Sequence, residues 1–174
     1  MSPSSSGSCS RPMKVLEKLK IVTHEPEKPP GRRARRRGEI IHQALALCET
    51  AKDLEGAVKG ALELLGESPK DWDLQELLDP LRRLFAVERF GEWLRKEGYP
   101  ELEVVDSSGR VHRIDRVVLD GNTLHVLEYK VGERERGHEE QVRLYAELLK
   151  GLFPTKRIKG WLIYVDQALI VEVL

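Results

Sequence analysis

The 174-residue sequence has little cysteine, no net charge and no long apolar run, and each absence excludes a class of protein. The two cysteines, Cys9 and Cys48, are too few for a disulfide framework or for a metal cluster held by four thiolates. No segment approaches the ~18 apolar residues that a membrane-spanning helix needs. The polar start also lacks the apolar stretch of a secretory signal. We therefore expect a cytoplasmic protein with no membrane association, in a reducing compartment.

Charge is abundant but balanced, with 29 Lys and Arg residues against 29 Asp and Glu residues. This balance argues against a polybasic protein that binds nucleic acid through bulk charge, and it leaves room for a local basic groove. Hydrophobic residues make up 40% of the chain, enough for one core. We expect a flexible tail over residues 1–30, rich in Ser, Pro and Gly, and a single domain over 31–174.

The apolar pattern changes its period near residue 100. Over 31–98 apolar residues recur at three- and four-residue spacings, which predicts a helical part with a break near 68–73. After the break we expect a short helix near 74–78 and a long helix over 81–94. Over 101–174 the pattern alternates, which predicts a sheet core. In chain order we expect strands at 101–105, 111–119 and 123–130, a helix at about 137–150, and strands at 158–165 and 168–173. The predicted fold class is α/β: a three-stranded antiparallel meander, then a helix and further strands.

Candidate chemistry lies on the hairpin expected around Asp120-Gly121-Asn122. Asp115 and Glu128 are on adjacent strands, so the hairpin can bring their carboxylates together. Two carboxylates share a small space only if a cation offsets their repulsion, and oxygen ligands suit Mg²⁺ or Mn²⁺. Lys130 projects from the same strand face as Glu128, where it can orient or deprotonate water. The alternative is an exposed, alternating charged face, although the apolar neighbours of Glu128 indicate a central strand.

Other polar residues share helical faces near these strands. Gln141 and Tyr145 are four apart on the expected helix, so they can support Lys130 or contact a phosphate. The alternative places Tyr145 in the core and Gln141 on the surface. His42, four residues after Gly38, is either a metal ligand or a core histidine. We expect the three tryptophans to be core residues, and His112 and His125 to lie at the rim.

Five arginines in six positions precede Gly38, namely Arg32, Arg33, Arg35, Arg36 and Arg37. They are either a solvated helix start or linker, or a strip that contacts DNA phosphates. Arginine suits phosphate because its planar fork donates two parallel hydrogen bonds. In a chain with no net charge such a cluster makes the electrostatic field uneven, and an uneven field steers a polyanion.

Taken in order, these motifs resemble the RecB-type nuclease domain of the PD-(D/E)xK superfamily. The resemblance rests on Gly38-x-x-x-His42, Arg113-Ile114-Asp115-Arg116, Glu128-Tyr129-Lys130 and Gln141-x-x-x-Tyr145, and it covers roughly residues 31–165. It implies a restriction-endonuclease-like fold and Mg²⁺-dependent cleavage of DNA, with a role in DNA repair or recombination. It also implies that His42, Asp115, Glu128 and the Tyr129 carbonyl are metal ligands, that Lys130 is the catalytic lysine, and that Gln141 and Tyr145 support it.

The sequence departs from the family pattern at several points. Arg113 stands where relatives often have glycine, and either Glu101 or Glu103 can supply the additional acidic residue of the preceding strand. The chain contains no P-loop, so it is expected to be a standalone nuclease, exo- or endonuclease, or a domain excised from a helicase. The alternative function is a catalytically weak nucleic-acid-binding module that docks a helicase or repair complex.

Overall fold

The computed structural model describes residues 31–135 and 137–174, and the predicted tail over 1–30 lies outside the described residues. The helical part comes first, as predicted for residues 31–98. It consists of α1 (Arg32–Leu47), α2 (Leu54–Leu64), α3 (Leu74–Phe85) and α4 (Glu88–Leu94), with short 3₁₀ turns at Ala51–Asp53 and Pro69–Asp71. The arginine strip is therefore the beginning of α1 and not a linker, and Gly38 lies inside that helix.

The boundary between α3 and α4 differs from the prediction. The sequence suggested a short helix near 74–78 and a long helix over 81–94, but α3 runs unbroken from Leu74 to Phe85. Its start is capped by Asp73, whose side chain accepts a hydrogen bond from the Gln75 backbone N–H. One buried stripe that includes Leu77, Leu81 and Leu84 holds the whole helix against the core.

The sheet has five strands in the order β1-β2-β3-β4-β5. The strands are β1 (Gly98–Val105), β2 (Val111–Asp120), β3 (Thr123–Lys130), β4 (Arg157–Tyr164) and β5 (Leu169–Glu172). The first three form the predicted antiparallel meander, and β5 is antiparallel to β4. Strands β3 and β4 are parallel, so the chain crosses between them through α5 (His138–Leu152). The predicted α/β fold class is confirmed.

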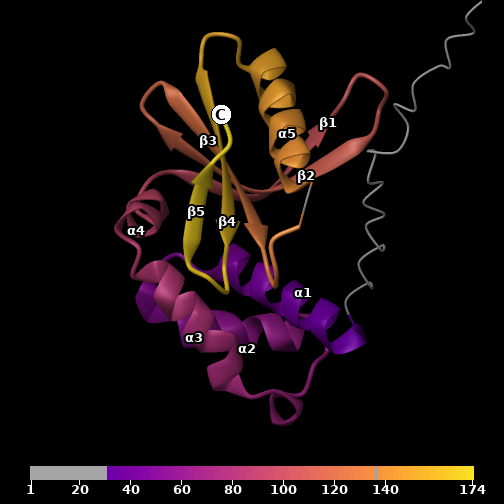
Figure 1. Cartoon of the computed structure of the whole chain (residues 1–174), viewed down its shortest axis with the longest axis vertical. Coiled ribbons are helices and arrows are strands. Elements are labelled where there is room, and N and C mark those ends of the chain that lie inside the picture. The colour runs from indigo at the N-terminus through magenta and orange to yellow at the C-terminus, as the bar shows by residue number, and fades with distance from the viewer. Residues whose placement is uncertain (1–30, 136) are drawn as a thin grey trace, which may run out of the picture.

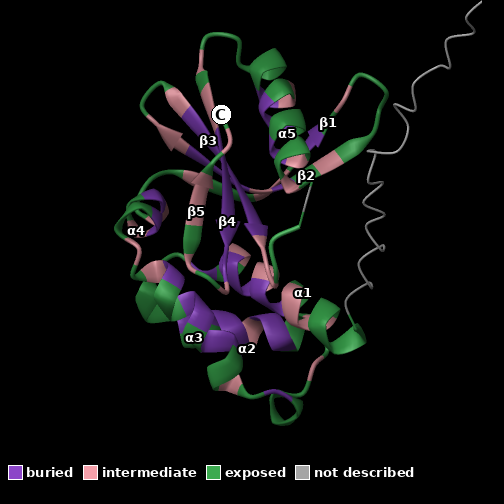
Figure 2. Cartoon of the chain, in the orientation of Figure 1, coloured by how far each residue is buried: buried purple, intermediate pink, exposed green. Residues whose placement is uncertain are grey.

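Helices cover both faces of the sheet (Figure 1). One face packs against α1 to α4 in a core that includes Val118, Leu127 and Tyr129. The other face packs against α5 in a second core that includes Val126 and Tyr145. Figure 2 shows the buried residues concentrated on β3, β4 and the inward sides of the helices. Alternate residues of β3 therefore enter different layers, and the end of β3 lies between α1 and α5.

All three tryptophans are buried, as predicted. His125 is also buried and not at the rim, because α4 and its Trp93 cover that end of β3. Among the described helices, none combines the length and the apolar character needed to cross a membrane.

Candidate active site

The β2–β3 hairpin brings Asp115 and Glu128 to the same end of the sheet. Its register runs from Asp120 opposite Thr123 to Arg116 opposite Leu127, and the two acids are the next residues on their strands. The backbone N–H of Tyr129 donates to Asp115 Oδ2 at 2.8 Å. The Asp115 carboxylate therefore binds the neighbouring strand directly and is fixed close to Glu128.

His42 reaches this end of the sheet from α1. Its Nδ1 lies 3.2 Å from Asp115 Oδ1, and its ring contacts the ring of Tyr129 edge to face. Burial opposes protonation of the imidazole, but the hydrogen bond to Asp115 and the charges of Asp115 and Glu128 together raise its pKa above the ordinary value. The Tyr129 ring is buried between α1 and α4, so only its backbone is available to the site.

Lys130 lies on the opposite side of the site, in a chain of hydrogen bonds that ends on α5. Its Nζ donates to Glu128 Oε1 at 3.0 Å and to Gln141 Oε1 at 2.8 Å. The Gln141 amide in turn donates to the Tyr145 hydroxyl at 2.7 Å. One turn of helix separates Gln141 from Tyr145, so α5 presents both groups to the same strand face. This arrangement fixes the position of the Lys130 ammonium group.

Glu128 is the most deeply buried acid of the site. Its side chain is only 5% exposed, and one carboxylate oxygen, Oε2, is buried with no hydrogen-bond partner among the described residues. Burial, and then repulsion from Asp115, raise the pKa of Glu128 above its usual range, although Lys130 acts in the opposite direction. A buried carboxylate oxygen without a partner is costly, so this position favours a cation.

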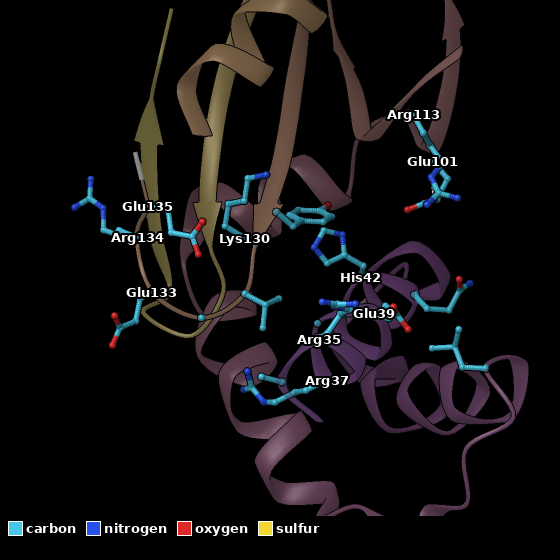
Figure 3. A pocket seen from close by; sticks show the side chains of 17 residues that line it. Arg35, Arg37, Glu39, His42, Glu101, Arg113, Lys130, Glu133, Arg134 and Glu135 are labelled. Atoms are coloured by element: carbon cyan, nitrogen blue, oxygen red, sulfur yellow. Dashed lines mark ion pairs between the residues drawn. The ribbon is translucent and has the colours of Figure 1, made fainter. Parts of the chain in front are cut away.

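A cavity of about 980 Å³ opens in front of these groups. Its lining includes His42 and Lys130, whereas Asp115 is more deeply buried, with a side chain 12% exposed. Figure 3 shows that the remaining wall comes from α1, from the Glu133–Glu135 segment after β3, and from Glu101 with Arg113. Chain segments far apart in the sequence therefore line one cavity.

Glu101 is the acid of β1 that enters the cavity wall. Its carboxylate pairs with Arg113 Nε at 2.8 Å, and its backbone has a φ of +53°, which non-glycine residues rarely adopt. The β1–β2 register puts it opposite Asp115, between the pairs Pro100–Arg116 and Leu102–Ile114. Glu103, the other acid of β1, is exposed. Backbone strain of this kind is common at functional sites.

The arginine strip divides into two groups. Three of its side chains bind the protein: Arg33 stacks on Trp72, Arg36 pairs with Glu39 and Glu67, and Arg37 pairs with Asp166. Arg32 and Arg35 are exposed, and none of the described residues provides an acidic partner for them. Arg35 lines the cavity.

The donor set of the site suits a hard divalent cation. Its candidates are two carboxylates on adjacent strands and the imidazole of His42, which contacts one of them, and the buried Oε2 of Glu128 offers a free lone pair. Within residues 31–135 and 137–174, no group of three or more His, Cys, Asp and Glu side chains converges closely enough to hold an ion as it stands. In this arrangement the Tyr129 N–H and His42 contact the two Asp115 oxygens, and Lys130 contacts Glu128 Oε1. The residue types therefore fit a divalent cation, and in this structure their other polar atoms bind neighbouring protein groups.

Sequence reasoning did not identify Asp166, which binds Arg37 and the Gly132 backbone beside the cavity. It follows β4 in a turn, and no local pattern connects it with α1. Arg113 belongs to the quoted motif and departs from the family pattern, but sequence reasoning gave it no role in the site. Arg113 is two residues from Asp115, so both lie on one strand face, and this spacing could have assigned Arg113 to the site.

Comparison with known proteins agrees with the fold. A sequence profile of the PD-(D/E)XK nuclease superfamily matches residues 7–172, almost the whole chain. The search of curated proteins gave no match. Among solved structures, the crystal structure of SSO0001 aligns at 18% sequence identity, over 78% of this chain and 64% of that chain, with a TM-score of 0.33. The chain thus spans less than two thirds of the length of that protein.

Proposed function

The chain belongs to the PD-(D/E)XK nuclease superfamily, and on this premise we propose that it is a deoxyribonuclease that uses Mg²⁺ or Mn²⁺ to hydrolyse phosphodiester bonds. The observation that supports the proposal best is Glu128, a buried acid with an unpartnered oxygen beside both Asp115 and Lys130. Two carboxylates in one small space need a cation to offset their repulsion. A protein that only bound DNA would gain nothing from acids where phosphate must lie.

In this proposal Asp115, Glu128 and His42 hold the cation, and the Tyr129 carbonyl is a further ligand. A bound divalent cation would lower the pKa of a water molecule and offset the negative charge that develops on the phosphate. The unpartnered Oε2 of Glu128 supports this assignment, and so does the Tyr129 N–H, which fixes the Asp115 carboxylate.

Lys130 is the proposed catalytic residue. Glu128 and Gln141 fix the Lys130 ammonium group at the cavity wall, where it can orient the attacking water or stabilise the transition-state charge. Only the neutral amine form of Lys130 has the lone pair needed to accept the proton of that water. Gln141 and Tyr145 act through Lys130: the amide accepts from Nζ and is itself held by the hydroxyl. They are positioning residues in this mechanism.

DNA contacts are assigned to the exposed part of the arginine strip. Arg32 and Arg35 project from the first turn of α1, and Arg35 reaches the cavity. Arg33, Arg36 and Arg37 contribute by holding α1 in place, because their guanidinium groups are engaged with the protein. We extend the proposal to a role in DNA repair or recombination beside a helicase or repair protein, on the strength of the RecB-type sequence motifs.

The direct test is cleavage of matched single-stranded DNA, double-stranded DNA and RNA, each labelled at either end, with Mg²⁺, Mn²⁺ or EDTA. The proposal expects DNA to be cut only when a divalent cation is present. A circular single strand in the same series separates an endonuclease, which opens it, from an exonuclease, which does not. DNA binding with no cleavage under any metal would replace the proposal with the binding-module alternative.

A further inference from the structure

A single acid, Asp166, connects three segments around the cavity. It lies in the turn after β4, and its carboxylate binds Arg37 of α1 through two hydrogen bonds, from Nη2 to Oδ1 at 2.6 Å and from Nη1 to Oδ2 at 3.1 Å. The same Oδ2 accepts the backbone N–H of Gly132 at 2.7 Å. The Asp166 carbonyl accepts from Arg83 of α3. Helices α1 and α3 and the segment after β3 therefore meet at this residue.

Two neighbours of Asp166 extend the same connection. The Val165 N–H donates to the Lys130 carbonyl at 2.9 Å, and the Gln167 amide donates to the Gly132 carbonyl at 3.0 Å. Gly132 has a φ of +95°, so the chain turns sharply there in a conformation that favours glycine. The turn after β4 thus holds the end of β3 and sets the direction of the chain after Gly132.

The residues after Gly132 form part of the cavity wall. Glu133, Arg134 and Glu135 follow Gly132 directly and line the cavity beside Lys130 (Figure 3). Arg37 lies five residues before His42 on α1, so the same ion pair also links the helix that carries His42 to the strand end that carries Lys130.

The ion pair is suited to hold this geometry. The Arg37 and Asp166 side chains are 17% and 23% exposed, and their two-pronged contact is the strong, directional form of a charge-assisted hydrogen bond. Burial opposes the charge of Asp166, but the hydrogen bonds from Arg37 and Gly132 hold its pKa below the ordinary value. Asp166 is therefore ionised at neutral pH, with its oxygens committed to the protein.

We propose that Asp166 is a positioning residue of the nuclease site: through Gly132 it sets the cavity wall and the end of β3 that carries Lys130, and Arg37 serves this acid instead of a DNA phosphate. The proposal rests on the proposed function for its catalytic part. Its structural part, the fixing of the segment after Gly132, is independent of any activity.

If Arg37 instead bound a DNA phosphate, Asp166→Asn would change DNA affinity in the opposite direction. If Arg37 were a phosphate ligand that Asp166 merely held in reserve, Asp166→Asn would release it, tighten DNA binding and steepen the dependence of affinity on salt. If Asp166 positions the site, Asp166→Asn weakens DNA binding and slows cleavage. Arg37→Gln should then produce at least the same defect, because it also removes the longer ion pair from Arg37 Nε to Glu76 at 3.7 Å. The double variant should be no worse than Arg37→Gln, because both lack the contact between Arg37 and Asp166.

The experiment compares Asp166→Asn, Arg37→Gln and the double variant with Glu172→Gln, which removes an exposed acid paired with Lys159 at the sheet edge. DNA affinity is measured in Ca²⁺ at several salt concentrations, and kcat and KM are measured in Mg²⁺. Trypsin digestion followed by mass spectrometry gives the rate of cutting after Arg134 relative to all other sites. This ratio is informative because a general loss of stability would raise cutting everywhere, whereas release of the wall raises it after Arg134.

The expected result is a selective rise in cutting after Arg134, a higher KM, and a kcat lower by roughly tenfold to a hundredfold, the loss that a small misplacement of a catalytic group produces. Glu172→Gln should match the wild type in every measurement. Tighter DNA binding by Asp166→Asn, or an unchanged tryptic pattern, would overturn the proposal. If the wild type cuts no DNA, the function fails, and the tryptic ratio still decides whether Asp166 holds the wall.

Discussion

Two buried titratable side chains, His125 and Glu128, lie three residues apart on β3 and have opposite surroundings. His125 Nδ1 accepts the indole N–H of Trp161 at 3.0 Å, so its buried polar atom is satisfied. Burial lowers the pKa of His125, which keeps the ring neutral and able to accept that bond. Glu128 has an unpartnered oxygen and a second acid beside it.

The two ends of β3 therefore have different roles: His125 contributes to packing, and Glu128 belongs to the candidate site. A satisfied buried polar group stabilises a unique packing, and the His125 end is closed by Trp93, Trp161 and the guanidinium of Arg89, which stacks on Trp161. An unsatisfied buried group is retained only where something else requires it. The end with Glu128 opens to a cavity, and the end with His125 does not supply its lining. The comparison predicts that changes at the two ends have effects of different kinds.

The largest effect is expected from Lys130→Ala. Cleavage should fall ~10²-fold or more, because the reaction loses a proton acceptor or a positive charge at the site. The fold should be retained, since Lys130 is only half-buried and contributes little to either core. Rates are measured with end-labelled DNA in Mg²⁺. Lys159→Ala, at the His125 end of β4, is the matched control and should cleave at the wild-type rate. Wild-type cleavage by Lys130→Ala would remove this residue from the mechanism.

The next effect concerns metal binding at Glu128. Glu128→Gln should weaken Mg²⁺ and Mn²⁺ binding in calorimetric titration, since the substitution removes the charge that the cation needs. Without metal the same variant should have a higher melting temperature, because a buried charge next to Asp115 is removed. Asp115→Asn should also weaken binding but bring no such gain, since both Asp115 oxygens already have protein partners.

Glu172→Gln controls for the loss of an acid and should leave both the melting temperature and the titration unchanged, because Glu172 is exposed. Undiminished metal binding in both Glu128→Gln and Asp115→Asn would exclude the two acids as ligands.

At the opposite end, pH should act on stability alone. The folded-state pKa of His125 is depressed by burial, so its contribution to stability is fully present above the unfolded value of about 6.5 and decreases as the pH falls below it. Protonation puts a hydrogen on Nδ1, where the Trp161 N–H must donate. We expect the melting temperature, followed by tryptophan fluorescence, to fall by on the order of 2–4 °C more in the wild type than in His125→Gln between pH 7.5 and 5.5. Parallel curves for the two proteins would show that His125 is not the responsible group.

Which side chains of the candidate site share a face could be predicted from the sequence, because side chains repeat every two residues along a strand and every 3.6 residues along a helix. The alternation of β3 put Glu128 and Lys130 on one face, and the four-residue spacing put Gln141 and Tyr145 on another. Those two faces meet in the structure through the bond from Lys130 to Gln141. The change of period near residue 100 predicted where the helical part ends and the sheet core begins.

Other features depend on tertiary packing and had no local signal. His125 was expected at the rim, because its own strand does not show that α4 will cover it. Arg37 and Asp166 are 129 residues apart, and nothing near either residue predicts their contact. The boundary between α3 and α4 also depends on the core, since the stripe of leucines continues to Leu84.

The smallest effect is expected within the arginine strip, where the contrast between structure and function appears again on one helix. Arg33 stacks on Trp72 and donates to the Asp71 carbonyl, whereas Arg35 lines the cavity and has no acidic partner among the described residues. Arg35→Gln should reduce the slope of log affinity against log salt by ~0.7–0.9, the contribution of one phosphate contact. Arg33→Gln should leave that slope unchanged and lower the melting temperature instead.

The measurement is DNA affinity in Ca²⁺ at several salt concentrations, for several unrelated sequences of the same length. Arg35→Gln should weaken all of them alike, since phosphate contacts position a strand without distinguishing its bases. Arg82→Gln, an exposed arginine of α3 paired with Asp79, tests whether any loss of positive charge has the same effect. Should the salt plots of Arg35→Gln and the wild type superimpose, Arg35 would be a solvated residue of the cavity edge. The first turn of α1 would then act like its neighbours Arg33, Arg36 and Arg37, by holding the helix in place.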